Sequence, residues 1–153
     1  MNIRWEVKKF DELTVHELYA LLRLRSEVFV VEQNCVFLDM DNNDQDCWHL
    51  LGWHDNQLVA STRLVPTGHV YNNMCSIGRV VTSGAYRRTG IGRILMERSI
   101  EETWRLFGVQ PIKIGAQLYL KDFYSSLGFE QSGDIYIEDG IDHIEMILPG
   151  PAS

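Results

Sequence analysis

A six-residue segment near the middle of the chain, RRTGIG at 87–92, has the residue types of an anion-binding loop. It lies between an apolar run at 77–81, which predicts a strand, and an amphipathic segment that predicts a helix. The first N–H groups of a helix lack internal acceptors, and that end of the helix carries partial positive charge. Gly90 and Gly92 have no Cβ, so a bulky anion can lie directly against the backbone. The spacing therefore predicts a pyrophosphate site, and the two arginines add positive charge beside it.

The residues after the loop disfavour two common carriers of a pyrophosphate group. A P-loop needs Lys followed by Ser or Thr after its last glycine, whereas Arg93 and Ile94 stand here. A dinucleotide-binding fold needs a third Gly or Ala three residues beyond the second glycine, and that position is Leu95. ATP, GTP and dinucleotides are therefore disfavoured as ligands.

A second motif, DFYSSLGF at 122–129, could supply an acid to a reaction near the first. Residues 112–117 before it alternate between apolar and polar or small side chains, which predicts a strand. Residues 119–127 then predict one helix that ends at Gly128. Tyr124 lies on that helix, and a phenol held near a leaving group can give it a proton.

Both motifs resemble those of the GNAT N-acetyltransferases, in which Arg/Gln-x-x-Gly-x-Gly/Ala follows a strand and a tyrosine precedes a Gly-Phe pair by four residues. The resemblance implies that the main chain of the loop holds the pyrophosphate of coenzyme A. It also implies that Tyr124 points at the sulfur and, as general acid, protonates the thiolate that leaves when an amine attacks the thioester. The implied cofactor-binding residues of the loop are Arg87, Arg88, Thr89, Gly90, Ile91 and Gly92.

The same resemblance implies a pantetheine site between two strands. In this fold a bulge makes the fourth and fifth strands diverge, and the pantetheine arm pairs with main-chain groups of the fourth strand. Those groups belong here to Val80, Val81 and Thr82. Gln117 occupies a pantetheine-contact position at which the family often has Asn, so the chain departs from the pattern there.

Further segments make the chain similar to the bacterial ElaA-type branch of the family over nearly its whole length. They are RSEVFVVEQNC at 25–35, Asp39-x-Asp41, IGRVV at 77–81, GAQ at 115–117 and EDGIDHI at 138–144. The resemblance implies an acetyl-CoA-dependent N-acetyltransferase that transfers the acetyl group directly to an amine. It supplies the donor and the fold but leaves the acceptor amine unidentified.

A general base is needed if the acceptor arrives as an ammonium ion, because only the free amine attacks the thioester. Glu32 follows the first predicted helix, where this fold shapes the acceptor pocket. His143 lies in the last predicted strand pair, on the other side of that pocket, and histidine titrates in the useful range. Three alternatives stay open: either residue is the base or an acceptor contact, or a water chain removes the proton and the residues are a helix-end carboxylate and a solvent-facing histidine.

Two functions of other classes also stay open. One is a coenzyme A-binding module without turnover. The other is an acyl-homoserine-lactone synthase, a relative of the same architecture whose N-terminal pattern is similar to Arg25, Val28-Phe29 and the acidic residues at 39–44. Such enzymes usually take acyl groups from a carrier protein and lack a full coenzyme A loop, so RRTGIG argues against this alternative.

Metal sites are not expected in this chain. The segment 39–44 resembles the front of a calcium loop but lacks Gly at the sixth position and has Leu50 at the twelfth. Cys35, Cys47 and His49 have no Cys-x-x-Cys pair beside them, so they do not predict zinc. We therefore interpret 39–44 as a solvated acidic loop.

The composition is that of one globular domain over residues 1–153, with 45% apolar and 23% charged residues. A net charge of −7 disfavours nucleic acid as a partner, because that binding depends on neutralising phosphates. No apolar run approaches the ~20 residues that a membrane span needs. Three cysteines, an odd number, argue against a disulfide framework and favour the reducing cytoplasm. The expected partners are acetyl-CoA and an amine; dimers are common in the fold, and the sequence leaves open whether this chain forms a homodimer.

The elements that must position these residues follow from periodicity, caps and turns. Thr14 and Glu17 have the spacing of a capping box, and Asp139-Gly140 predicts a tight turn. Strands are predicted at 2–10, 48–54, 57–65, 75–82, 112–117, 134–138 and 142–148, and helices at 14 to about 29–32, 90–107 and 119–127. The order predicts an α/β protein with a mixed, twisted sheet of about seven strands and about four helices, which the resemblance identifies as the GNAT fold.

Overall fold

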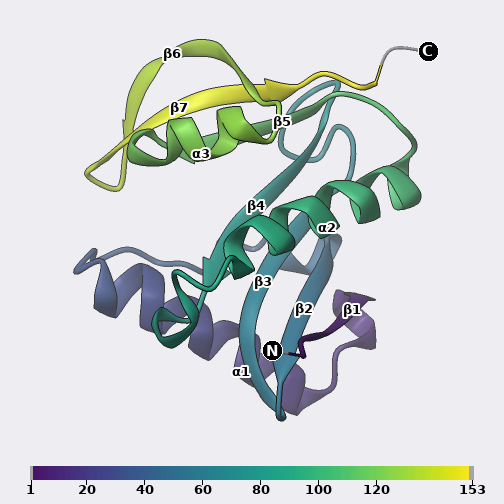
Figure 1. Ribbon diagram of the computed structural model, residues 1–153, viewed down its shortest axis with the longest axis vertical. Coiled ribbons are helices and arrows are strands. Elements are labelled where there is room, and N and C mark those ends of the chain that lie inside the picture. The colour runs from purple at the N-terminus through teal and green to yellow at the C-terminus, as the bar shows by residue number, and fades with distance from the viewer. Residues whose placement is uncertain (1, 152–153) are drawn as a thin grey trace.

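Seven strands form a sheet in the order β1-β2-β3-β4-β5-β7-β6, and α-helices cover it (Figure 1). The computed structural model describes residues 2–151. Neighbouring strands are antiparallel except β4 and β5, which run parallel. The strands are β1 Arg4–Lys9, β2 Trp48–His54, β3 Gln57–Val65, β4 Cys75–Thr82, β5 Ile112–Gln117, β6 Glu130–Glu138 and β7 Ile141–Leu148. The predicted mixed α/β class with about seven strands is confirmed.

The described residues contain three α-helices, one fewer than the approximate count from the sequence. They are α1 Val15–Arg25, α2 Ile91–Phe107 and α3 Lys121–Ser126. A π-helical turn, Ser26–Glu32, continues α1 to the predicted end of that helix. The predicted helix 119–127 is instead a 3-10 turn, Leu118–Leu120, followed by α3. Leu120 has φ −98° and ψ 7°, outside the α-helical region, so the α-helix begins only after it.

Caps and turns agree with the sequence more closely than the strand ends do. The Glu17 N–H donates to Thr14 Oγ1 at 3.1 Å and the Thr14 N–H donates to Glu17 Oε1 at 2.8 Å, so the capping box is confirmed. Asp139 and Gly140 have φ of 51° and 76°, the left-handed pair that a tight hairpin turn needs. β6 begins at residue 130 rather than 134, because pairing with β7 keeps its Ser- and Gly-containing start extended.

The hydrophobic core has layers on both faces of the sheet. Leu21 and Leu24 of α1 pack with Leu51, whereas Leu95 of α2 packs with Leu50. Successive strand residues point to opposite faces, so α1 and α2 cover opposite sides of β2 and β3. α2 crosses β3 and β4, and α3 lies beside β5 and β7 (Figure 1). No helix within residues 2–151 has the length and apolar character needed to cross a bilayer.

A bulge in β4 opens the centre of the sheet. Ser61 of β3 pairs with Val81 and Arg63 pairs with Gly78, so β4 has one residue more than β3 between these pairs. Arg79 lies in this bulge with φ of 45°, a left-handed conformation that is uncommon for a non-glycine residue. The ladder between β4 and β5 contains two residue pairs, at the start of each strand. Beyond them the strands separate, as the resemblance implied.

The acidic segment 39–44 differs most from the sequence-based expectation, because two of its three carboxylates are buried. Asp39 and Asp44 are each 5% exposed and pair with Arg25, which is 1% exposed. Arg25 Nε lies 2.8 Å from Asp39 Oδ2, and its Nη1 lies 2.8 Å from Asp44 Oδ1. Arg63 and Arg79 complete a neutral cluster of three arginines and three aspartates, which we call the buried ion network. Its members are Arg25, Arg63, Arg79, Asp39, Asp41 and Asp44.

The network keeps Asp41 and Asp44 ionised. Burial alone would raise the pKa of both, but hydrogen bonds and charge from Arg63 lower the pKa of Asp41, and those from Arg25 and Arg63 lower the pKa of Asp44. A buried carboxylate without these partners would carry a large desolvation cost. The segment is therefore fixed to α1 and β3, and it supports Arg79 at the bulge.

His49 makes the folding stability depend on pH. The ring is fully buried beside this network, with Nε2 3.0 Å from the Asp44 carbonyl, and burial lowers its pKa. Below an unfolded pKa of ~6.5 the unfolded chain takes up a proton that the folded chain refuses. We expect the free energy of unfolding to fall by ~1.4 kcal/mol per pH unit below that value, down to the folded pKa.

Urea unfolding of the parent and of His49→Gln between pH 5.2 and 7.2 measures this contribution. The parent should lose stability more steeply than the variant as the pH falls, because glutamine does not titrate. Parallel pH dependences for the two proteins would contradict the assignment to His49.

Candidate active site

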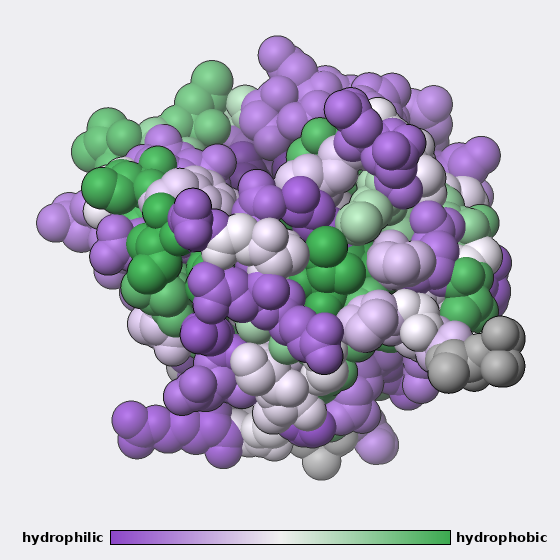
Figure 2. All heavy atoms as spheres, turned by 90° about the horizontal axis from the view of Figure 1, so that it is seen from above, coloured by the Kyte–Doolittle hydropathy of each residue, from purple (hydrophilic) through white to green (hydrophobic). Residues whose placement is uncertain are grey.

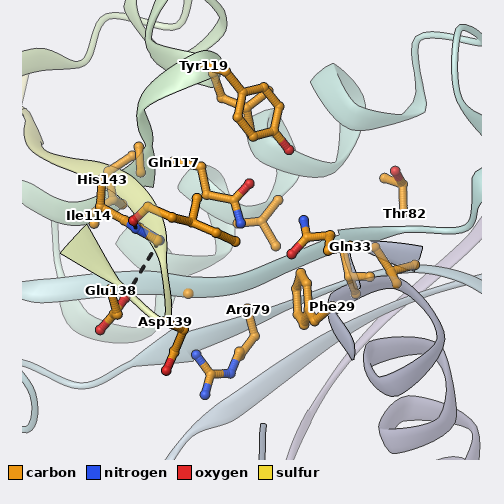
Figure 3. A pocket seen from close by; sticks show the side chains of 18 of the residues that line it. Phe29, Gln33, Arg79, Thr82, Ile114, Gln117, Tyr119, Glu138, Asp139 and His143 are labelled. Atoms are coloured by element: carbon orange, nitrogen blue, oxygen red, sulfur yellow. Dashed lines mark hydrogen bonds and ion pairs between the residues drawn. The ribbon is translucent and has the colours of Figure 1, made fainter. Parts of the chain in front are cut away.

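A cleft of about 580 Å³ opens where β4 and β5 diverge. One wall is the π-helical turn after α1, and the other is formed by β5, α3 and the β6–β7 turn. Phe29 and Gln33 lie across the cleft from Gln117 and His143, with Arg79 between the two walls (Figure 3). Since β4 has no β5 partner along this stretch, main-chain groups of the strand border the cleft.

The N-terminus of α2 lies at the edge of this cleft with the features of an anion site. Gly90 is the N-cap residue with φ of 84°, no side chain caps the helix, and its first turn holds no acidic residue. A Cβ built on Gly90 or Gly92 would have no heavy atom within 4 Å, so the space over both residues is open. The uncapped N–H groups and this open surface fit a bulky anion such as a pyrophosphate.

Arg87, from the loop before α2, and Glu32, from the π-helical turn, form a bidentate ion pair in the cleft lining. The Arg87 hydrogen bonds lower the pKa of Glu32, which outweighs the effect of its slight burial. Glu32 is thus a stable carboxylate and a weak proton acceptor near neutral pH. In this arrangement the Arg87 guanidinium is neutralised by Glu32, so the positive field at the cleft comes from the helix terminus and from Arg88.

Tyr124 projects from α3 into the cleft between aromatic neighbours. It is 5% exposed and packs edge-on against Phe123 and Phe129. Burial raises the pKa of its hydroxyl, so the phenol stays protonated over the whole neutral range. Within residues 2–151 the hydroxyl has no hydrogen-bond partner, which leaves its proton available to a group in the cleft.

His143 is buried in the cleft wall, not exposed on a strand surface. It is 8% exposed and stands opposite Gln117 in the β5–β7 ladder. Nδ1 lies 2.7 Å from the Ile141 carbonyl, which can only accept, so Nδ1 carries the proton of the neutral ring. Nε2 therefore keeps its lone pair, and Glu138 Oε2 lies 3.6 Å from it. The arrangement can accept a proton from a group in the cleft.

Most of the residues predicted from the sequence meet at this cleft. Its lining includes Tyr124, Glu32, His143, Val80, Val81, Thr82, Arg87, Gly92 and Gln117. Arg88, Thr89 and Gly90 are exposed beside the cleft, and the Ile91 side chain packs in the core. Thr89 Oγ1 donates to the Tyr86 carbonyl at 2.5 Å, a local hydrogen bond within the loop before α2.

Arg79 and Glu138 also line the cleft, although neither is among the site residues predicted from the sequence. Arg79 Nη2 donates to the Asp39 carbonyl at 2.7 Å from within the cleft wall, and its guanidinium lies over the Phe37 ring. A signal for Arg79 was present, since a charged residue inside the apolar run 77–81 needs a buried partner. No local pattern indicated Glu138, whose place beside His143 depends on the β6–β7 register.

No group of three or more His, Cys, Asp or Glu side chains in residues 2–151 is arranged to hold a metal ion. The acidic residues that resembled a calcium loop make ion pairs with arginines instead. Cys47 and His49 are both buried, and burial raises the pKa of the Cys47 thiol to about 12. That thiol is therefore neutral and a poor metal ligand.

Comparison with known proteins places this chain in a family. The sequence model of the acetyltransferase (GNAT) domain matches residues 27–149. Protein ElaA of Escherichia coli strain K12 is 42% identical over 146 residues, which are 94% of this chain and 95% of ElaA. The crystal structure of an acyl-CoA N-acyltransferase from Pseudomonas aeruginosa has a TM-score of 0.91 at 42% identity, covering 95% of this chain and 99% of that chain.

A more distant neighbour bears on the second alternative function. The crystal structure of the acyl-homoserine-lactone synthase LasI has a TM-score of 0.81, covering 97% of this chain and 90% of that chain, at 12% identity. At that identity the likeness is one of fold alone.

Proposed function

Because the chain belongs to the GNAT acetyltransferase family, we propose that it transfers an acetyl group from acetyl-CoA directly to an amine. The observation that carries this proposal is the cleft between β4 and β5, with an uncapped helix terminus at one edge and a buried, protonated tyrosine inside. These features supply an anion site, unpaired strand backbone and a proton donor in one place. An amide-containing thioester carrier with a pyrophosphate group needs all three.

In this proposal the main chain of residues 88–92 holds the pyrophosphate at the N-terminus of α2. Main-chain groups of Val80, Val81 and Thr82 pair with the pantetheine arm, which replaces the missing β5 ladder. Gln117 lies on the opposite wall and can bond to the same arm through its amide. The thioester would then lie between β4 and Tyr124.

The chemistry follows from the groups that line the cleft. His143 Nε2 takes a proton from the ammonium form of the acceptor, and the free amine nitrogen attacks the thioester carbonyl. The carbon–sulfur bond breaks as the nitrogen releases its second proton to solvent and the amide forms. Tyr124 gives its proton to the leaving thiolate and is reprotonated from solvent. Glu32, whose pKa is low, acts as an acceptor contact through its negative charge rather than as the base. No covalent intermediate on the chain is needed.

The proposal also places the protein in the cytoplasm. Cys35, Cys47 and Cys75 are free thiols, which a reducing compartment preserves. Acetyl-CoA would have to be present in the same compartment as the amine acceptor.

The direct test combines binding and turnover. Calorimetric titration with acetyl-CoA measures donor binding, and release of free thiol across a panel of amines measures transfer. Acceptor-dependent thiol release supports the proposal. Tight acetyl-CoA binding without release on any amine would favour a binding module without turnover, and failure to bind acetyl-CoA would overturn the donor site.

Gly92→Ala provides a variant that separates the anion site from folding. The Cβ has open space and alanine favours a helix over glycine, so stability should rise by up to ~1 kcal/mol. The same methyl group lies over the N–H groups of the anion site, so we expect acetyl-CoA affinity to fall about tenfold or more, equivalent to ~1.4 kcal/mol.

Calorimetry and urea unfolding measure the two effects, with Gly133→Ala in β6 as the control outside the cleft. Unchanged affinity in a stably folded Gly92→Ala protein would place the pyrophosphate somewhere else.

A further inference from the structure

The end of the cleft at the β6–β7 turn has an acidic lining. Glu138 and Asp139 line it beside His143, and the three residues gather at one end in the close view (Figure 3). The Cys35 thiol donates to the Asp139 carbonyl at 3.2 Å, which ties the opposite wall to this turn. We call Glu138, Asp139 and His143 the acidic end of the cleft.

The carboxylates at the acidic end are not neutralised by the arginines of the cleft. Arg79 is paired with Asp39 and Asp41 of the buried ion network, and Arg87 is paired with Glu32. The hairpin itself, residues 130–145, contains six acidic residues and no lysine or arginine. The end of the molecule that carries this hairpin shows hydrophilic residues interspersed with hydrophobic ones (Figure 2). The acidic end therefore keeps an excess of negative charge.

A second, independent observation points to a cationic donor in this place. His143 Nε2 and Glu138 Oε2 are 3.6 Å apart, and both are acceptors when the ring is neutral. The histidine is 8% exposed, and within residues 2–151 its Nε2 has no hydrogen-bond partner. Each of these two acceptors can therefore receive an N–H from a cationic amine in the cleft.

The rest of this region is apolar. Phe29, Phe37 and Ile141 are among the residues that line the same cleft. Hydrocarbon packs favourably against such side chains, whereas a carboxylate on the acceptor would meet the negative charge of Glu138 and Asp139. The lining suits an alkyl chain that carries positive charge at both ends.

We propose that the acceptor is an aliphatic diamine, held with one amino group at His143 and its second ammonium group at Glu138 and Asp139. This inference rests on the proposed acetyl transfer. The amine at His143 loses one proton to the ring before it attacks, and its nitrogen loses a second proton to solvent as it forms the amide bond with the acetyl carbon and the carbon–sulfur bond breaks. The thiolate takes its proton from Tyr124, which is later reprotonated from solvent, and the second ammonium group keeps its charge throughout.

Three acceptors of equal length test the proposal because they differ only at the far end. They are 1,4-diaminobutane, butylamine and 4-aminobutanoate, which place a positive, a neutral or a negative group opposite the reacting amine. We expect kcat/KM for the diamine to exceed that for butylamine about tenfold, with 4-aminobutanoate the poorest. The preference should shrink at 0.5 M salt, because ions screen exposed charges.

The double variant Glu138→Gln/Asp139→Asn tests the residues. Asparagine tolerates the left-handed backbone of position 139, so the turn is preserved. The ratio of diamine to butylamine kcat/KM should fall about tenfold. The control Asp134→Asn removes a charge from the same hairpin outside the cleft lining and should leave the ratio unchanged.

Equal use of all three acceptors, or a diamine preference that survives in the double variant, would overturn this inference while leaving acetyl transfer intact. Failure of the proposed function would instead appear as no thiol release with any amine. In that case, calorimetry of 1,4-diaminobutane on protein saturated with coenzyme A still decides: binding that the double variant weakens supports the site, and no binding overturns it.

Discussion

Replacing Tyr124 with phenylalanine is expected to lower kcat by about 100-fold or more, the range for loss of a general acid. The variant removes one hydroxyl from a residue that is buried beside Phe123 and Phe129, so the aromatic packing remains. The pKa of the hydroxyl is raised by burial, so nearly every molecule carries the proton that the leaving thiolate needs. Acetyl-CoA affinity should change little, because the pyrophosphate and the pantetheine are held elsewhere.

Thiol release under saturating substrates measures this effect, and a single-turnover experiment establishes that chemistry limits the rate. Tyr19→Phe, on the exposed face of α1, is the matched control and should keep the parent rate. Parent-like turnover in Tyr124→Phe, with chemistry rate-limiting, would remove the residue from the role of acid.

Replacing Arg25 with methionine is expected to destabilise the fold by roughly 3–5 kcal/mol, the usual cost of removing one partner from a buried ion pair. The substitution leaves Asp39 and Asp44 in a buried site without the guanidinium that donates to both of them. Folded domains have only ~5–15 kcal/mol of total stability, so this is a large fraction. The apolar face of α1 around Leu21 and Leu24 should still pack.

Urea unfolding followed by circular dichroism measures the loss. Arg23→Met on the same helix is the control, since Arg23 is exposed and its pair with Glu27 is worth ~0.5 kcal/mol or less. Nearly equal urea midpoints for the two variants would show that the network contributes no more than a surface ion pair.

Much of the scaffold could be predicted from the sequence because its signals are local. The capping box at Thr14 and Glu17, the turn at Asp139-Gly140 and the glycine loop at 87–92 each depend on neighbours within a few residues. The apolar runs of β2 and β3 and the alternation on β5 are equally local. The structure agrees with the predicted cap, turn and strands and places the glycine loop at the start of α2, and the family comparisons agree with the resemblance that the two motifs carry.

The contacts that the sequence did not predict join residues far apart in the chain. Asp44 is buried because Arg25, 19 residues earlier, reaches it. Glu32 is paired with Arg87, 55 residues later. This ion pair makes Glu32 a poor base, although its position in the sequence made it a candidate for that role. The acidic segment was expected to be solvated because charged residues usually face water. Two of its aspartates are buried instead because arginines on α1 and β3 pair with them.

The divergence of β4 from β5 has a mechanical consequence. Two residue pairs are all that the ladder provides between the four-stranded half of the sheet, β1 to β4, and the three-stranded half, β5 to β7. A donor whose amide groups bond to β4 while its tail contacts β5 would act as an extra rung between these halves. A bound donor would therefore make the whole sheet more rigid. Release of coenzyme A would make the boundary between β4 and β5 flexible again, so that the next acetyl-CoA can enter there.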